Sequence, residues 1–179
     1  MSTRVNPIAE QSKKWLCNAM LELLQEKPYN KITITEICDK AGLVRKTFYR
    51  HFTSKESVLV TVIDLMFEEF YEYIQDQEMG ANEMPLAYFT FWEKHKKFLH
   101  ILIQNQLYAL LNDQYVHYLE EMAHIVGGKR AYLSELEKDY MRTMLAAGLW
   151  SLLKKWILRD CSETPEEMAR MTLVFFDVE

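Results

Sequence analysis

The chain has 179 residues, of which 49% are hydrophobic, while only five are glycine and four are proline. This length allows one or two domains with a substantial core, and the scarcity of glycine and proline favours an all-helical protein. The formal net charge of −5 argues, taken alone, against a nucleic-acid partner, and no apolar run approaches the roughly 20 residues that a membrane span needs.

The charge is unevenly distributed along the chain. The first 57 residues contain ten basic and six acidic residues, a net charge of +4, so the remaining residues carry −9. A basic N-terminal part on an acidic remainder is typical of a DNA-binding domain fused to a regulatory domain. The distribution therefore reverses the argument from the net charge.

The first residues and the cysteines indicate the compartment. The residues before Pro7 are polar, and we expect no secretion signal there. Cys17, Cys38 and Cys161 are an odd set at unrelated spacings, which favours reduced thiols in a core, with a redox switch as the alternative. We therefore expect a cytoplasmic protein.

Two helices are predicted before residue 42. The first spans about residues 8–26, and Pro28 lies just beyond its end. Thr33 and Glu36 predict a capping box at the start of the second. The apolar residues of this second helix recur at i, i+3, i+4 and i+7, as one stripe made of Ile34, Ile37, Cys38 and Ala41.

A sharp turn and a cationic helix follow. Gly42 supplies the positive φ that a sharp turn needs, and the next helix is predicted from about Val44 to His51. Its apolar residues point one way, and its other faces carry Arg45, Lys46, Thr47, Tyr49, Arg50 and His51. Two short helices joined by such a turn indicate a helix-turn-helix with a cationic recognition helix.

Three segments carry a family resemblance: Ala41-Gly42-Leu43, residues 47–52 (TFYRHF) and Ser54-Lys55-Glu56. They resemble the N-terminal signature of TetR/AcrR-type transcriptional regulators, and the resemblance runs from about residue 15 to residue 59. It implies an all-α fold of about nine helices, with an N-terminal helix-turn-helix DNA-binding domain at residues 1–56 and a helical ligand-binding and dimerisation domain at 57–179.

One position departs from the signature. Many members carry serine or another capping residue where this chain has Val44, which cannot accept a hydrogen bond from the first turn. We expect the recognition helix to start less firmly, or a phosphate to satisfy its first N–H groups.

The recognition helix and its surroundings predict the contacts to double-stranded DNA. Arg45 suits a guanine edge, Lys46 a base or a phosphate, and Thr47 a thymine methyl or a phosphate. The resemblance implies phosphate contacts for Tyr49, His51, Lys55 and either Thr33 or Thr35. The candidate set is Thr33, Thr35, Val44, Arg45, Lys46, Thr47, Tyr49, Arg50, His51 and Lys55. The competing class is a helical interaction protein whose head binds a protein partner and not DNA.

The middle of the chain predicts four further helices. Thr53 and Glu56 predict a capping box for a long fourth helix ending near Gln75, Pro85 can begin a fifth, and residues 98–104 and 107–125 give the sixth and seventh. The resemblance implies a small-molecule pocket among them, although aromatic residues at helical spacing more often form a core. The candidate ligand residues are Phe67, Phe70, Tyr71, Tyr88, Trp92, Tyr108, Tyr115, Met122 and Met144.

The last two predicted helices are strongly apolar. The eighth spans about residues 131–158, after a break at Gly127-Gly128, and Thr164 with Glu167 caps the ninth. The resemblance implies that the pair forms a four-helix bundle with a second copy, while part of these residues fills the protomer's own core. The candidate interface residues are Met144, Ala147, Gly148, Ser151, Met168, Met171 and Phe175.

Enzymatic chemistry has little support. His95, His100, His117 and His124 are spaced by five and seven residues, which does not place adjacent metal ligands on one helix. The sequence also lacks a phosphate-cradling glycine loop and a nucleophile elbow. We expect no enzyme, no metal and no cofactor. We predict a repressor that binds a palindromic operator as a dimer and is released by a small-molecule effector; the alternative is a regulator or activator controlled by a partner protein.

Overall fold

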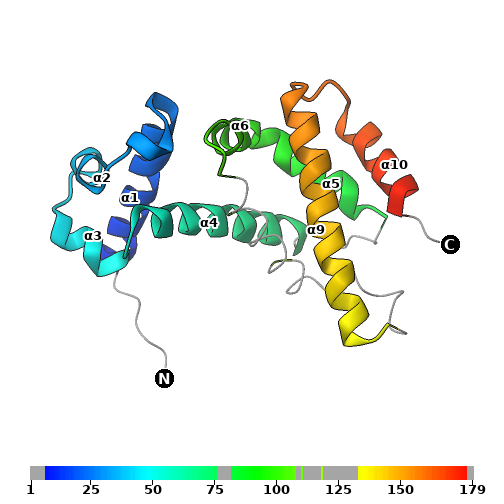
Figure 1. The fold of residues 1–179 in the computed structure, drawn as a ribbon, viewed down its shortest axis with the longest axis horizontal. Coiled ribbons are helices and arrows are strands. Elements are labelled where there is room, and N and C mark those ends of the chain that lie inside the picture. The colour runs from blue at the N-terminus through cyan, green and yellow to red at the C-terminus, as the bar shows by residue number, and fades with distance from the viewer. Residues whose placement is uncertain (1–6, 76–81, 108–109, 111–117, 119–132, 177–179) are drawn as a thin grey trace. The chain divides into compact units, whose positions relative to one another are not determined.

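The computed structural model describes residues 7–75, 82–107, 110, 118 and 133–176. Within these residues it contains eight α-helices, one short 3-10 helix and no strand, which confirms the predicted all-α fold (Figure 1). The chain divides into two compact units, Met1–Leu65 and Met66–Glu179, called here the head and the body. In the described parts of the chain no helix combines the length and the apolar character needed to cross a bilayer.

The head consists of α1 (Pro7–Glu26), a 3-10 turn (Tyr29–Lys31), α2 (Ile34–Ala41), α3 (Arg45–His51) and the first half of α4 (Lys55–Gln75). Helix α1 packs against both α2 and α3. The apolar stripes predicted from the sequence meet in its core, which buries Leu16, Met20, Leu23, Ile37, Cys38, Phe48, Phe52, Val58 and Leu59. Each of the Leu, Met, Ile, Phe and Val side chains among them contributes about 1.5–3 kcal/mol when fully buried, so this core stabilises the head.

The division between the units falls inside α4, between Leu65 and Met66. Val58, Leu59, Val62 and Ile63, in the first half of α4, are buried in the head. The division by packing therefore lies nine residues beyond the functional boundary that we predicted after residue 56, which stays a prediction.

Three helix starts have complete capping boxes. Thr33 with Glu36 and Thr164 with Glu167 cap α2 and α10, as predicted, and Ser134 with Glu137 caps α9 without having been predicted. The predicted box of Thr53 and Glu56 is wrong. Ser54 and Ser57 cap α4 instead, and each backbone N–H donates to the other's Oγ at 3.2 Å.

The body contains the second half of α4 and four more described helices: α5 (Met84–Lys94), α6 (Lys96–Gln104), α9 (Glu135–Leu158) and α10 (Pro165–Phe176). Helix α10 packs against α5, and α6 packs against α9. Phe89 of α5 meets Trp156 of α9 edge to face, with ring centroids 5.3 Å apart. Of the predicted seventh helix, only Leu107, Leu110 and Tyr118 are described, and the last two are helical; the Gly127-Gly128 break lies outside the described residues.

Candidate nucleic-acid interface

A left-handed residue makes the turn between α2 and α3. Gly42 has φ of +66°, and the N–H of the next residue, Leu43, donates to the Cys38 carbonyl at 2.9 Å. The turn that the sequence predicted is therefore present, and it joins α2 and α3 through only three residues, 42–44.

Helix α3 is held by its apolar side. Phe48 is fully buried and contacts the buried Phe52, with ring centroids 5.7 Å apart. Its opposite side is open: Val44, Arg45, Lys46, Tyr49 and Arg50 are exposed. Thr47 and His51 are half-buried at the edges of this surface. The arrangement presents a cationic helix face of the size that enters a DNA major groove.

The start of α3 lacks a side-chain cap. Val44 occupies the N-cap position in an extended conformation, and no side chain there accepts a hydrogen bond from the first turn. This is the structural counterpart of the departure noted in the sequence.

Arg45 and Tyr49 are paired on the exposed side of α3. The Arg45 Nη2 donates to the Tyr49 hydroxyl at 3.1 Å, and the guanidinium carbon lies 5.8 Å from the centre of the Tyr49 ring. Tyr49 in turn meets the buried Phe48 edge to face at 5.4 Å. Sequence reasoning assigned the two residues separate DNA contacts and missed this pair, although their i, i+4 spacing on one helix favours it.

His51 ends the recognition helix in a half-buried position. Burial first, and then the charge of the adjacent Arg50, lower the pKa of His51. The neutral imidazole can therefore supply an N–H to a phosphate without a full positive charge.

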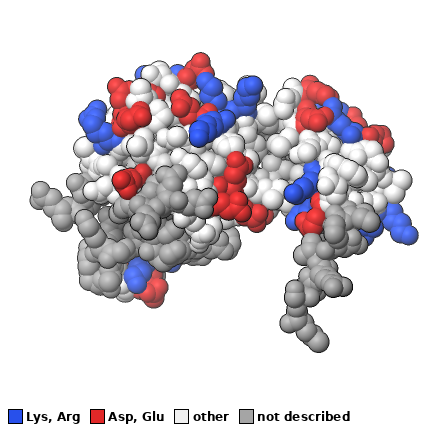
Figure 2. Space-filling view, turned by 180° about the vertical axis from the view of Figure 1, so that it is seen from behind, with Lys and Arg blue, Asp and Glu red and all other residues white. Residues whose placement is uncertain are grey.

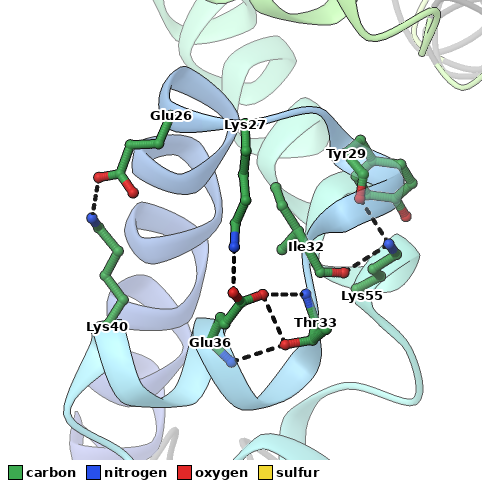
Figure 3. Close-up of polar contacts among 8 residues, drawn as sticks. All are labelled: Glu26, Lys27, Tyr29, Ile32, Thr33, Glu36, Lys40 and Lys55. Atoms are coloured by element: carbon green, nitrogen blue, oxygen red, sulfur yellow. Dashed lines mark hydrogen bonds and ion pairs between the residues drawn. The ribbon is translucent and has the colours of Figure 1, made fainter.

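Ion pairs fix α2 on α1 (Figure 3). Lys27 donates to the Glu36 carboxylate, which also accepts from the backbone N–H of Thr33 at 2.9 Å. On the neighbouring turn, Lys40 pairs with Glu26 at 2.5 Å and with Glu22 at 3.4 Å. The hydrogen bond from Lys27, followed by those from Thr33, lowers the pKa of Glu36 to about 2.

These pairs bear on the positive charge of the head and on the DNA-binding candidates Thr33 and Thr35. Lys27 and Lys40 belong to the positive excess of the head, yet both are engaged with carboxylates. Thr33 and Thr35 are both exposed, and the Thr33 hydroxyl is already used in the capping box. The cations that remain at the turn and recognition helix are therefore those of α3 itself.

Lys55 is hydrogen-bonded within the head (Figure 3). Its Nζ donates to the carbonyl oxygens of Tyr29 and Ile32, both at 2.8 Å, and lies 4.3 Å from the centre of the Tyr29 ring. An ammonium group has three donors, so two are committed to the backbone. A phosphate contact, as the resemblance implied, would have to use the third.

Aromatic rings of α4 and α5 fill the space between these helices in the body. Phe67 meets Trp92 at 5.7 Å and stacks on Tyr118 at 4.6 Å, while Phe70 meets Tyr88 at 5.9 Å. Four candidate ligand residues, Phe67, Phe70, Tyr88 and Trp92, thus pack with other rings as core residues do. Tyr71, which follows Phe70 in the sequence, is half-buried. Tyr108, Tyr115 and Met122 lie outside the described residues.

The long helix α9 exposes one continuous side, called here the outer face: Leu136, Tyr140, Met144, Ala147, Ser151 and Leu158. Their spacing of three and four residues, with Lys155 completing the series, keeps them on one side of the helix. Met144 is 61% exposed there, so we remove it from the candidate ligand site and keep it as an interface candidate.

The other interface candidates differ in exposure. Gly148 is half-buried at the edge of the outer face, Met171 of α10 is half-buried and Phe175 is exposed. Met168 is buried within the protomer, at 6% exposure, and belongs to its core. Burial within the protomer leaves Met168 little surface for a partner.

On the side drawn in Figure 2, acidic and basic side chains are interspersed over both units, without a broad surface of one sign. Among the described residues, no group of three or more His, Cys, Asp and Glu side chains is arranged to hold a metal ion. Cys17 and Cys38 are buried free thiols, and Cys161 is half-buried.

Comparison with known families assigns both parts of the chain. A family model described as bacterial regulatory proteins of the tetR family matches residues 16–62. A second, described as the C-terminal region of transcriptional regulators, matches residues 80–177. Together the two matches cover the helix-turn-helix and most of the body.

Individual relatives agree in class. The chain is 29% identical over 182 residues to an uncharacterized HTH-type transcriptional regulator, YxbF, of Bacillus subtilis, an alignment that covers 94% of this chain and 45% of that one. This chain thus spans less than half the length of that relative. It is 23% identical over 154 residues to the dhaKLM operon transcriptional activator DhaS of Lactococcus lactis, covering 84% and 82% of the two chains.

The fold is shared with solved structures of the same class. A TetR transcriptional regulator from Streptococcus agalactiae superposes with a TM-score of 0.67 at 21% identity, over 93% of this chain and 94% of that one. At this identity the similarity establishes the fold alone.

Proposed function

Since this chain belongs to the TetR family of bacterial transcriptional regulators, we propose that it is a repressor that binds a palindromic operator as a homodimer in the cytoplasm. The observation that carries the DNA-binding part is α3, whose buried Phe48 holds the helix while Arg45, Lys46, Tyr49 and Arg50 face outward. No catalytic role is assigned to any residue.

Selection of operators from random duplex DNA with the full chain tests this proposal. We expect an enriched palindrome whose half-sites lie about 34–36 Å apart, or a multiple of that distance. Binding should weaken by about 10³–10⁵ between 50 and 200 mM salt if six to ten phosphates are contacted. No enriched sequence and no salt dependence would favour the alternative, a helical protein whose head binds another protein.

The proposed homodimer rests on α9. On its inner side, Leu145, Trp150, Leu153 and Trp156 are buried within the protomer. Its outer face is also largely apolar. A helix that is apolar on both sides is typically covered on both. We propose that the second copy of the chain covers the outer face, together with Met171 and Phe175 of α10.

For control, we propose a small-molecule effector that enters the body beside Phe67, Tyr71 or Trp92 and prefers the conformation that cannot bind DNA. A preference of about 100-fold is worth about 2.7 kcal/mol, and DNA must weaken effector binding by the same factor. Compounds are screened for release of the selected operator, and the screen is repeated with Tyr88→Trp, which adds volume at a buried ring. A retained response in Tyr88→Trp would contradict this location.

A second candidate is favoured by a specific relative. DhaS, which is 23% identical to this chain, is described as a transcriptional activator. In addition, the rings around Phe67 already pack against one another, which leaves less space for an effector in the body. The alternative is therefore an activator whose signal comes from a partner protein, and transcription from the selected operator, with and without the chain, distinguishes activation from repression.

A further inference from the structure

The recognition helix carries a pair that separate DNA contacts do not explain. Arg45 and Tyr49 are one helical turn apart and joined by a hydrogen bond of 3.1 Å, and the guanidinium lies beside the ring. The Tyr49 ring, although 52% exposed, meets the fully buried Phe48 edge to face at 5.4 Å, which restricts its movement. The long side chain of Arg45 is thus bonded to Tyr49, whose ring packs against the core residue Phe48.

The donors and acceptors of the pair allow a chain of contacts. The Tyr49 oxygen accepts from Arg45 with a lone pair, so the hydroxyl proton can still be donated to a phosphate oxygen. The guanidinium has five N–H donors in a planar fork, and one bond to Tyr49 leaves enough of them for two bonds to a guanine edge. Phosphate, Tyr49, Arg45 and base can therefore be bonded in series.

We propose that Tyr49 is a positioning residue for base recognition by Arg45, and that it links a phosphate contact to the reading of one base pair. This inference rests on the proposed DNA-binding function. Tyr49 orients the guanidinium before DNA arrives, which removes part of the entropic cost of ordering Arg45 on the operator. Loss of the hydroxyl should therefore lower discrimination at Arg45's base pair, in addition to weakening binding to any sequence.

The experiment compares the full chain with Y49F, R45A and the double variant on the selected operator, on the three other base pairs at each position, and on a scrambled duplex. Phenylalanine keeps the ring and its contact with Phe48 but removes the hydroxyl. The base pair at which R45A loses discrimination, by roughly 5- to 150-fold, identifies the one that Arg45 reads. His51→Ala is the matched control for loss of a phosphate contact and should weaken binding to all duplexes alike.

We expect Y49F to lower discrimination at that base pair by roughly two- to tenfold. In the R45A background, Y49F should lower affinity without further change in discrimination. Two results would overturn the proposal: discrimination unchanged in Y49F, or the same fall in both backgrounds. Failure of the unaltered chain to prefer any sequence would overturn the DNA-binding function itself, so the two failures are distinguishable. Equal unfolding temperatures of the variants show that the fold is not the cause.

Discussion

Lysines of the head show how one side-chain type serves different purposes. Lys46 on α3 is exposed, Lys40 is bonded to carboxylates of α1, and Lys55 is bonded to the backbone between α1 and α2. From the sequence, Lys46 and Lys55 were expected at the DNA, and Lys40 counted toward the positive charge of the head. The distinction depends on which acceptors the fold brings near each ammonium group, and a sequence does not display those.

Replacing Lys55 with alanine should therefore affect the fold as well as DNA binding. The change removes two charge-assisted hydrogen bonds of 2.8 Å from a half-buried position, and we expect the free energy of unfolding to fall by about 1–2 kcal/mol. Urea denaturation measures this, with Lys46→Ala as the control that should weaken DNA binding only. An unchanged stability with a salt slope lower by about one unit would mean that Lys55 is simply a phosphate ligand.

Substitutions at Gly42 test the turn between α2 and α3. A Cβ at Gly42 would meet no other atom within 4 Å, so the cost of a side chain comes from its φ of +66° alone. Gly42→Ala should destabilise the chain by about 1–2 kcal/mol, and Gly42→Asn by less, because asparagine tolerates the left-handed region. Equal losses in the two variants, measured by thermal unfolding, would point to a different cause.

Helix starts illustrate what the sequence determines about each element. The boxes at Thr33 and Thr164 were predictable because one polar residue stands three before a glutamate, with no competitor nearby. At residues 53–57 two overlapping pairs were available, and Ser54 with Ser57 took the place of Thr53 with Glu56. The choice depends on where the chain leaves α3, which is a matter of three-dimensional packing.

The contact of α2 with α1 should depend on pH through Glu36. Its pKa is lowered from the ordinary value of 4.5 to about 2, so its stabilising contribution is present above about pH 4.5 and is lost as the pH falls toward 2. The difference in melting temperature between the unaltered chain and Glu36→Gln should be largest near neutral pH and shrink across this window. A difference that stays constant from pH 6 to pH 2.5 would show that the carboxylate charge is not responsible.

More of the head than of the body could be predicted from the sequence. The helix-turn-helix is built from contacts close in sequence, and its apolar stripes, turn and exposed cations were all visible as patterns. In the body, segments far apart in the chain determine the packing. Phe67 contacts both Trp92 and Tyr118, and Met168 is buried within the protomer. The spacing of apolar residues predicts a helix, but where a helix is apolar on two sides it does not predict which side is exposed.

The outer face of α9 allows the assembly to be tested without disturbing the protomer. Met144 is 61% exposed, so Met144→Glu should leave the unfolding of the isolated chain nearly unchanged. In the proposed dimer it would bury an unpaired carboxylate on each copy, at a cost of several kcal/mol, and we expect the dissociation constant to rise by roughly 100-fold or more. Gln104→Glu on α6, also exposed, makes the same change of charge and should leave the dimer intact.

Sedimentation measures the assembly, and operator binding measures its consequence. Because a single helix-turn-helix contacts only one half-site, a monomeric Met144→Glu chain should lose most of its affinity for the full palindrome while binding an isolated half-site as before. A variant that is still dimeric at low micromolar concentration would place the interface elsewhere. A monomeric variant that keeps full operator affinity would separate dimerisation from DNA binding, against the coupling that the proposed function requires.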